Sequence, residues 1–333
     1  MIALRMLRAG VTRSTAVSAR RTSSYLFDKD TAIVPIVPVV STSKSPISST
    51  TDNDSDSAAG YATTATTIFR TAGVVSSNFS IANHPNGGYT MAMCISAARG
   101  VIPYRDTITT TCHYLNPMLE NEIAFFHARI LKKSKTTATV EVACVQQNQE
   151  RVRFTGTFGD LSSLQGTSRA IQTDHDPSCY VDQLPPVAEC RDDTLWAGLR
   201  KLKVGTLYEK GIQVWVPEDS PFVTGLLCGK SGGEPRVDAH VTFLDGRPPC
   251  LRSLALFNDC LPPAVLNWAG MASWVPTMEY TVHTYGRPDP SGPMRMSFRA
   301  DVIRNGVATI NGVVKDVNGD LCSVSRQLCT IRV

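Results

Sequence analysis

The chain has 333 residues, of which 42% are hydrophobic and 19% charged, an ordinary globular composition whose length suits one large domain or two smaller ones. Its formal net charge of +4 comes from residues 1–27, which hold five arginines and no acid, while the remaining 28 basic and 29 acidic residues nearly balance. The charge therefore gives no support for nucleic-acid binding. The ten cysteines include no CxxC pair and no histidine cluster completes a zinc site, so no metal is predicted.

The composition of the N-terminus predicts a targeting segment. Residues 1–26 combine the arginines with several serines and threonines, which is typical of a mitochondrial presequence rather than of a secretory signal. This predicts a mitochondrial matrix protein, and the alternative is a disordered basic tail. The run AIVPIVPVV (32–40) is short and broken by prolines, so no transmembrane helix is expected. Residues 39–60, rich in Ser, Thr, Asp and Ala, predict a disordered insertion.

After the targeting segment the chain repeats one pattern twice. The first repeat, 27–160, opens with a short strand candidate at 27–35. An apolar helix candidate at 84–100 begins at two glycines, and a β-rich run at 107–117 ends in Asn-Pro. Three alternating segments separated by turn residues complete the repeat, at 121–131, 136–147 and 151–158.

A linker, 161–205, is predicted before the second repeat, 206–333. The second repeat has a strand candidate at 207–216 and an apolar helix candidate at about 250–267. A β-rich run at 277–288 mirrors the β-rich run of the first repeat. The remaining strand candidates and the hairpin turns between them are 294–304, Asn305-Gly306, 307–317, Asn318-Gly319 and 321–332.

Each repeat thus predicts one apolar helix and several long antiparallel strands. A sheet with one apolar face needs a cover, and an apolar helix laid across it supplies one. The predicted fold class is α+β. It is a double hot-dog, in which each of two repeats wraps a long antiparallel sheet around a central helix.

Six stretches, in order along residues 68–332, resemble the acyl-CoA thioesterase II-like superfamily of double hot-dog proteins. They are NHPNGGYTMA (83–92), TCHYLNP (111–117), VTFLDGRPP (241–249), LFNDCLPPAV (256–265), WVPTMEYTVHTYGRP (274–288) and DVNGDLCSVSRQLCTIR (316–332). The resemblance implies a thioesterase that hydrolyses fatty acyl-CoA to free fatty acid and coenzyme A. It also implies a homodimer that needs neither a cofactor nor a metal, with acyl-CoA as its partner.

The resemblance further implies three catalytic residues in the second repeat, which together bind and orient the attacking water. Asp259 in NDCLPP, Thr277 in VPTMEY and Gln327 in SVSRQLC match the family's aspartate, threonine and glutamine. Taken singly, each has a structural interpretation: a turn or cap for Asp259, and ordinary strand positions for Thr277 and Gln327. The chemistry favours catalysis, because an ionised aspartate can accept a proton from a water that the hydroxyl and amide hold.

The first repeat lacks this combination. No acid lies between Gly87 and Gly100, and the position that matches Gln327 falls near Thr157. The first repeat instead supplies Gly87 and Gly88, whose free N–H groups at a helix start are candidate donors to the oxyanion of the reaction. The alternative for these two glycines is tight helix–sheet packing or a turn.

Two other functions stay open at this point. A hot-dog hydratase or dehydratase acting on acyl-CoA or acyl carrier protein generally needs a histidine beside the acid, which His84 could supply if it lay near Asp259. A non-catalytic acyl-binding or assembly protein would be favoured if Gln327 faced solvent, or if side chains filled the apolar channel expected between helix and sheet. His113 and His283 occupy matching positions in the two repeats, which suggests strand packing.

Overall fold

The computed structural model describes most of the chain outside its N-terminal quarter. The described residues are 23–36, 67–163, 181–191, 205–220, 233–270 and 274–332. The insertion predicted at 39–60 lies outside the described residues, and so does the predicted presequence up to residue 22. In the described part, no helix is long and apolar enough to cross a membrane.

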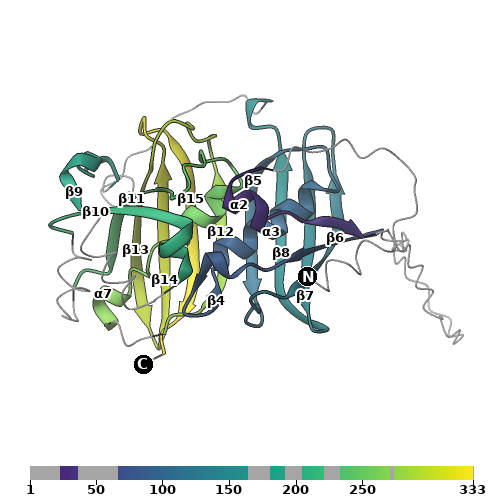
Figure 1. The fold of residues 1–333 in the computed structure, drawn as a ribbon, viewed down its shortest axis with the longest axis horizontal. Helices are drawn as coiled ribbons and strands as arrows, with labels where there is room; N and C mark the ends of the chain where they lie inside the picture. The colour runs from purple at the N-terminus through teal and green to yellow at the C-terminus, as the bar shows by residue number, and fades with distance from the viewer. Residues whose placement is uncertain are drawn as a thin grey trace, which may run out of the picture.

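One antiparallel sheet of 13 strands forms the body of the molecule (Figure 1). The first half runs, in sheet order, through β1 (Val34–Ile36), β2 (Ile68–Val74), β6 (Ile123–Lys133), β7 (Ala138–Gln146), β8 (Gln149–Gly159) and β5 (Asp106–Tyr114). The second half continues through β12 (Thr277–Thr284), β15 (Leu321–Thr330), β14 (Val307–Lys315), β13 (Met294–Arg304), β11 (Arg236–Phe243), β10 (Ile212–Pro217) and β9 (Cys190–Arg191). A separate short ribbon pairs β3 (Ser80–Ile81) with β4 (His84–Pro85).

The two halves join along β5 and β12, which pair antiparallel at the centre of the sheet. Thr111 lies opposite Thr281, and their hydroxyl oxygens are 2.8 Å apart. Cross-strand threonine pairs of this kind stabilise neighbouring strands. The predicted double hot-dog is confirmed, with the two repeats fused into one continuous sheet.

Two helices lie against each other on the inner side of the sheet. The longer, α3 (Gly87–Arg99), is apolar on nearly every side and buried along most of its length, as expected of a central helix. The shorter, α6 (Ser253–Phe257), packs against it and runs in the opposite direction, since Gly88 lies beside Ala255 while Ser96 bonds Arg252. The first half of the sheet carries α3 on β6, β7 and β8 (Figure 1).

The helix predicted at about 250–267 is much shorter in the structure, so its predicted length is wrong. The helix ends at Phe257, and only the short helix α7 (Leu266–Ala269) follows. Pro262 and Pro263 explain the break, because a proline has no N–H to donate and disfavours helical backbone in the residue before it. Asp259 therefore lies in a turn just beyond the end of α6 rather than inside a helix.

The strand predicted at 27–35 is also partly wrong. A short helix, α2 (Leu26–Asp30), buries Phe27 completely against the rings of Phe79 and Phe243, and β1 begins only at Val34. The Ser23 hydroxyl donates to Asp28 at 2.9 Å, and the N–H of Leu26 donates to Asp245 at 2.7 Å. The folded contacts thus begin a few residues before the boundary at 26 that composition suggested.

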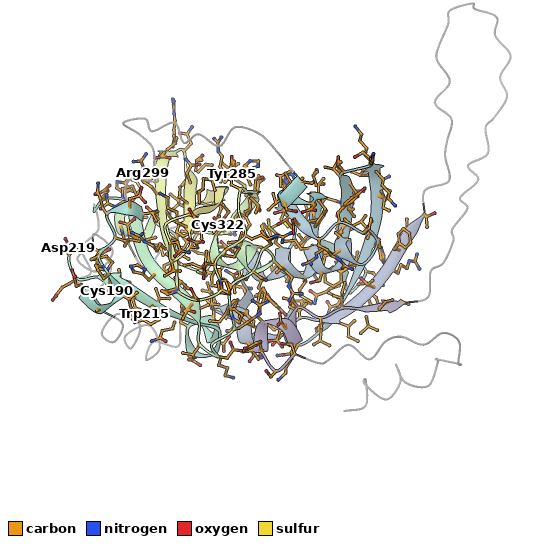
Figure 2. All side chains as sticks on the ribbon, turned by 90° about the horizontal axis from the view of Figure 1, so that it is seen from above. Cys190, Trp215, Asp219, Tyr285, Arg299 and Cys322 are labelled. Atoms are coloured by element: carbon orange, nitrogen blue, oxygen red, sulfur yellow. The ribbon has the colours of Figure 1, made fainter. Side chains whose placement is uncertain are left out.

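The predicted linker, 161–205, already contains part of the second half. Cys190–Arg191 form the edge strand β9 against β10, and Val181 and Leu184 pack with Val313 on the second half of the sheet. The run predicted as one strand at 207–216 begins with a π-helical turn, η4 (Leu207–Gly211), before β10. Figure 2 shows Cys190, Trp215 and Asp219 together at this outer edge, far from the junction of the two halves.

Three 3₁₀ turns complete the described elements: η1 (Ser77–Phe79), η2 (Leu161–Ser163) and η3 (Val187–Glu189). The hairpin predicted at Asn305-Gly306 is confirmed between β13 and β14, with φ of 53° and 71° at its two central residues. These positive values are the ones that a tight two-residue hairpin turn requires.

Candidate functional site

Asp259 lies where the end of α6 meets the start of α3. Its Oδ2 accepts hydrogen bonds from the N–H of Gly88 at 2.8 Å and from the side-chain amide of Asn86 at 3.0 Å. The first turn of a helix carries unpaired N–H groups and the positive end of the helix dipole, so it favours a carboxylate at this place. The aspartate of the second half is therefore held by the first half.

Asn86 joins the helix cap to the carboxylate and was missed by sequence reasoning. It is the N-cap of α3, because its Oδ1 accepts the N–H of Tyr89 at 2.9 Å. Its Nδ2 donates to the main-chain oxygen of Asp259 at 2.7 Å as well as to Oδ2. The available signal was its position, since asparagine directly before a helix is a preferred N-cap.

The other oxygen of Asp259 faces β15. The Nε2 of Gln327 donates to Asp259 Oδ1 at 2.8 Å and to the main-chain oxygen of Asn258 at 3.3 Å. The Oε1 of the same amide accepts from the hydroxyl of Thr277, 3.4 Å away at the start of β12. The structure thus brings together the three residues predicted to act on water, and Thr277 reaches Asp259 through Gln327.

The surroundings of Asp259 raise its affinity for protons. Burial raises the pKa of Asp259 to about 6, although the hydrogen bonds from Gly88, Gln327 and Asn86 act to lower this pKa. The residue as a whole is half-buried, and both of its carboxylate oxygens accept hydrogen bonds from the protein. Such a group is mostly ionised at neutral pH and still has a pKa close enough to 7 for efficient proton transfer.

Two tyrosines lie beside the turn, the buried Tyr280 and the half-buried Tyr114. The hydroxyl of Tyr114 donates to the main-chain oxygen of Gly87 at 2.8 Å, and that of Tyr280 donates to the main-chain oxygen of Ala255 at 2.8 Å. Burial raises the pKa of both phenols well above the ordinary value, so both remain neutral donors. They fix the backbone of the two helix ends that hold Asp259.

Gly88 is required by the close approach of the two helices. A Cβ at this position would lie 2.2 Å from the main-chain oxygen of Ala255, whereas a Cβ at Gly87 would meet Asp259 Oδ2 and the Tyr114 hydroxyl, each at 2.9 Å. In this structure the N–H of Gly88 is bonded to Asp259. The oxyanion role expected for Gly87 and Gly88 stays a prediction, and tight packing accounts for Gly88 by itself.

The histidines do not form a second catalytic pair. His84 is exposed on β4, with its ring centroid 5.4 Å from that of Trp274, and no hydrogen bond among the described residues joins it to Asp259. His113 and His283 lie exposed on β5 and β12. The described residues also include no group of three or more metal-ligating side chains.

Two family models match the chain. The model of the acyl-CoA thioesterase N-terminal domain matches residues 75–159, and that of the acyl-CoA thioesterase C-terminal domain matches residues 182–331. Together they cover the two halves of the sheet and the residues around Asp259. No curated protein matches the chain.

Solved structures share the fold. A thioesterase II-type protein from Thermobifida fusca superposes with a TM-score of 0.66 at 23% identity, covering 79% of this chain and 92% of that one. A hot-dog protein of unknown function from Alicyclobacillus acidocaldarius gives 0.65 at 17% identity, with 93% and 99% covered. An acyl-CoA thioesterase II from Mycobacterium marinum gives 0.58 at 16% identity, with 79% and 93% covered.

Proposed function

The chain belongs to the acyl-CoA thioesterase family and is a thioester hydrolase, and we propose that it hydrolyses fatty acyl-CoA with a water activated by Asp259, Thr277 and Gln327. The observation that carries the assignment of these residues is the Asp259–Gln327–Thr277 chain of hydrogen bonds. Gln327 is 8% exposed and directed at the carboxylate. This orientation supports catalysis over the acyl-binding alternative, which a solvent-facing Gln327 would favour. The other feature that would favour that alternative, side chains that fill the space between α3 and the sheet, is present in the structure.

The proposed reaction proceeds without a covalent enzyme intermediate. The oxygen of water attacks the thioester carbonyl carbon while Asp259 accepts the proton that this oxygen loses. The tetrahedral intermediate then expels the sulfur of coenzyme A, and the protonated Asp259 returns its proton to that sulfur. The products are a free fatty acid and coenzyme A, and the aspartate is again ionised. Thr277 and the amide oxygen of Gln327 orient the water, since each can accept a hydrogen bond from it.

The acyl chain is proposed to bind between α3 and the sheet. Fully buried apolar side chains fill this space in the structure, among them Met91, Phe126 and Phe154. A fatty acyl chain would have to displace some of them. Met91 is suited to this, because an unbranched thioether side chain repacks easily. The length of the channel that opens when these side chains move would set the preferred acyl-chain length.

We expect the full-length protein to release coenzyme A from fatty acyl-CoA substrates. A panel from short to long acyl chains, followed with a thiol reagent, would show a chain-length optimum if a defined apolar channel opens. The same acyl groups carried on acyl carrier protein form the second arm. If thiol is released from the acylated carrier protein but not from acyl-CoA, the substrate is the acyl carrier protein. If thiol is released from neither, the proposed substrate class is rejected.

The rate of hydrolysis should depend on pH through Asp259. The general base must be ionised, so kcat/KM should rise about tenfold per pH unit below about 6 and level off above it. The Gln327→Leu variant removes a hydrogen bond that stabilises the ionised form, so its acidic limb should move to higher pH. Stopped-flow thiol release between pH 4.5 and 8.5 measures both profiles. A wild-type rate independent of pH in this range would argue against Asp259 as the base.

Two further proposals follow from the sequence. The arginine-rich, acid-free N-terminus supports delivery to the mitochondrial matrix, which import of the full-length chain into isolated mitochondria would test. The family resemblance supports a homodimer in solution, which light scattering would test by its mass. Import failure or a monomeric mass would remove the corresponding proposal without affecting the hydrolase.

A further inference from the structure

A cavity of about 270 Å³ lies at the other end of α3 from Asp259. The two ends of this 13-residue helix are about 20 Å apart at 1.5 Å per residue. Four arginines, one carboxylate and one thiol contribute the polar lining: Arg99, Arg105, Arg252, Arg287, Asp106 and Cys250. This is a space for a compact anion.

The cavity and the Asp259 site occupy equivalent positions in the two repeats. At Asp259 the start of α3 meets the end of α6, beside the start of β12 and the end of β5. At the cavity the start of α6 meets the end of α3, beside the start of β5 and the residues that follow β12. Asp106 opposes Gly159 on β8 as Thr277 opposes Cys329 on β15. The two repeats thus build two equivalent places.

The counterpart does not carry the hydrolytic residues. The same register that pairs Thr277 with Cys329 places Thr157 where the second half has Gln327. No acid occurs in residues 87–104, which correspond to α6 and the turn after it, and the one carboxylate that lines the cavity, Asp106, is bonded to Arg287. The arginines stand at a place whose equivalent performs the proposed chemistry, so the cavity is a binding place without a general base.

The charges of the cavity are not balanced by the protein. Arg287 bonds Asp106 at 2.7 Å, and Arg252 shares Asp28 with Arg247. The side chains of Arg99 and Arg105 make no ion pair or hydrogen bond within the part of the chain that the structure describes. Burial and then the neighbouring Arg252 lower the pKa of Arg99, so this guanidinium is repelled where it lies. Converging cations without partners are stabilised when an anion enters between them.

The thiol of Cys250 lines the same cavity and is affected by nearby arginines. Arg247 donates to its sulfur at 3.2 Å. Burial acts to raise the pKa of this thiol, but Arg247, a hydrogen bond from the Ser253 backbone and the nearby Arg252 together outweigh burial and lower its pKa. The thiol lines the cavity beside Arg252, so an anion bound there would cover it.

We propose that this cavity is a second, non-hydrolytic site that binds a phosphate group through Arg99, Arg105 and Arg252. Guanidinium groups match phosphate because their planar N–H donors can bond two oxygens at once. The phosphate can come from free inorganic phosphate or from the phosphorylated nucleotide end of a cofactor such as coenzyme A. The binding does not rest on the proposed hydrolysis, since none of its residues contacts Asp259.

The test uses the full-length protein in a phosphate-free buffer. Sodium phosphate and adenosine 3′,5′-diphosphate are titrated separately, with sodium chloride keeping the ionic strength constant. At concentrations well above Kd we expect the melting temperature to rise by about 2–4 °C. Alkylation of Cys250 by iodoacetamide, followed by peptide mass spectrometry, should slow roughly tenfold at ten times Kd. The titration that saturates at the lower concentration identifies the source of the phosphate.

Two variants separate this site from general salt effects. Arg99→Met removes an unpaired guanidinium while keeping a straight helical side chain, so it should be at least as stable as wild type without phosphate and lose the response. Arg304→Met changes an exposed arginine at the end of β13 and should keep the full response to phosphate. A full phosphate response in Arg99→Met would overturn the proposal. So would equal stabilisation by chloride, or unchanged alkylation of Cys250 at stabilising phosphate concentrations.

Discussion

Replacing Asp259 with asparagine is expected to lower kcat for acyl-CoA hydrolysis by about 10²–10⁴-fold, the range that a positioned general base contributes. Asparagine keeps the size of the side chain and removes its ability to accept a proton from water. The KM for acyl-CoA should change little, because Asp259 acts on water rather than on the substrate. Thiol release under steady-state conditions measures both constants.

The fold of the Asp259→Asn variant needs its own measurement. The carboxylate holds Gly88, Asn86 and Gln327, so the variant could lose activity by loosening these contacts. Because burial raises the pKa of Asp259 to about 6, the folded state takes up the proton before the unfolded state does. The stability of wild type relative to the variant should therefore fall as pH rises from about 4 to 6. A well-folded variant with wild-type kcat would reject Asp259 as the base.

Replacing Gly88 with alanine is expected to destabilise the protein by more than about 3 kcal/mol, beyond the usual range for an overpacked core. The new Cβ would lie 2.2 Å from the main-chain oxygen of Ala255, and backbone cannot rotate away as a side chain can. The helices α3 and α6 would have to separate. The better helix propensity of alanine, worth about 1 kcal/mol, offsets only part of this cost. Urea unfolding followed by circular dichroism measures the free energy of unfolding.

A matched glycine makes the comparison specific. The nearest heavy atom to a Cβ at Gly233 is 3.4 Å away, an ordinary contact distance, so Gly233→Ala should unfold close to wild type. Gly87→Ala is an intermediate case, because its new Cβ meets the side chains of Asp259 and Tyr114 rather than backbone. We expect it to lose activity with a smaller loss of stability. Equal stability of Gly88→Ala and Gly233→Ala would show that the two helices do not pack this closely.

The repeated pattern of the sequence predicted most of the sheet. The strands β12 to β15 begin at the predicted residues, and the Asn305-Gly306 turn lies where expected, because alternation and turn chemistry are local signals. The long helix α3 was predicted for the same reason. Elements with weak local patterns were missed or misassigned. Leu207–Gly211 form a π-helical turn, although the alternation across 207–216 predicted a single strand. Leu26–Asp30 form a helix, and its Phe27 is fixed by rings that are distant in the sequence.

The candidate site was predicted in its residues and not in its geometry. Asp259, Thr277 and Gln327 came from the family resemblance, and no local signal places residue 259 against residue 327. Asn86 was missed, because only the folded chain shows that its amide reaches Asp259. The end of the helix at Phe257 was also missed, although Pro262 and Pro263 in the sequence indicate a helix break nearby. The arginine cavity could not be predicted, since its side chains come from four separate segments.

The junction of β5 with β12 has a consequence for how the enzyme responds to dilution. Asn86 and Gly88 come from one half of the sheet, whereas Asp259 and Gln327 come from the other, and a single polypeptide carries both halves. Were the halves separate molecules, the site would have to be assembled by association, and its occupancy would follow protein concentration. Here the tether holds each half at a fixed, high effective concentration of the other. Assembly of these four residues into one site is therefore independent of the protein concentration.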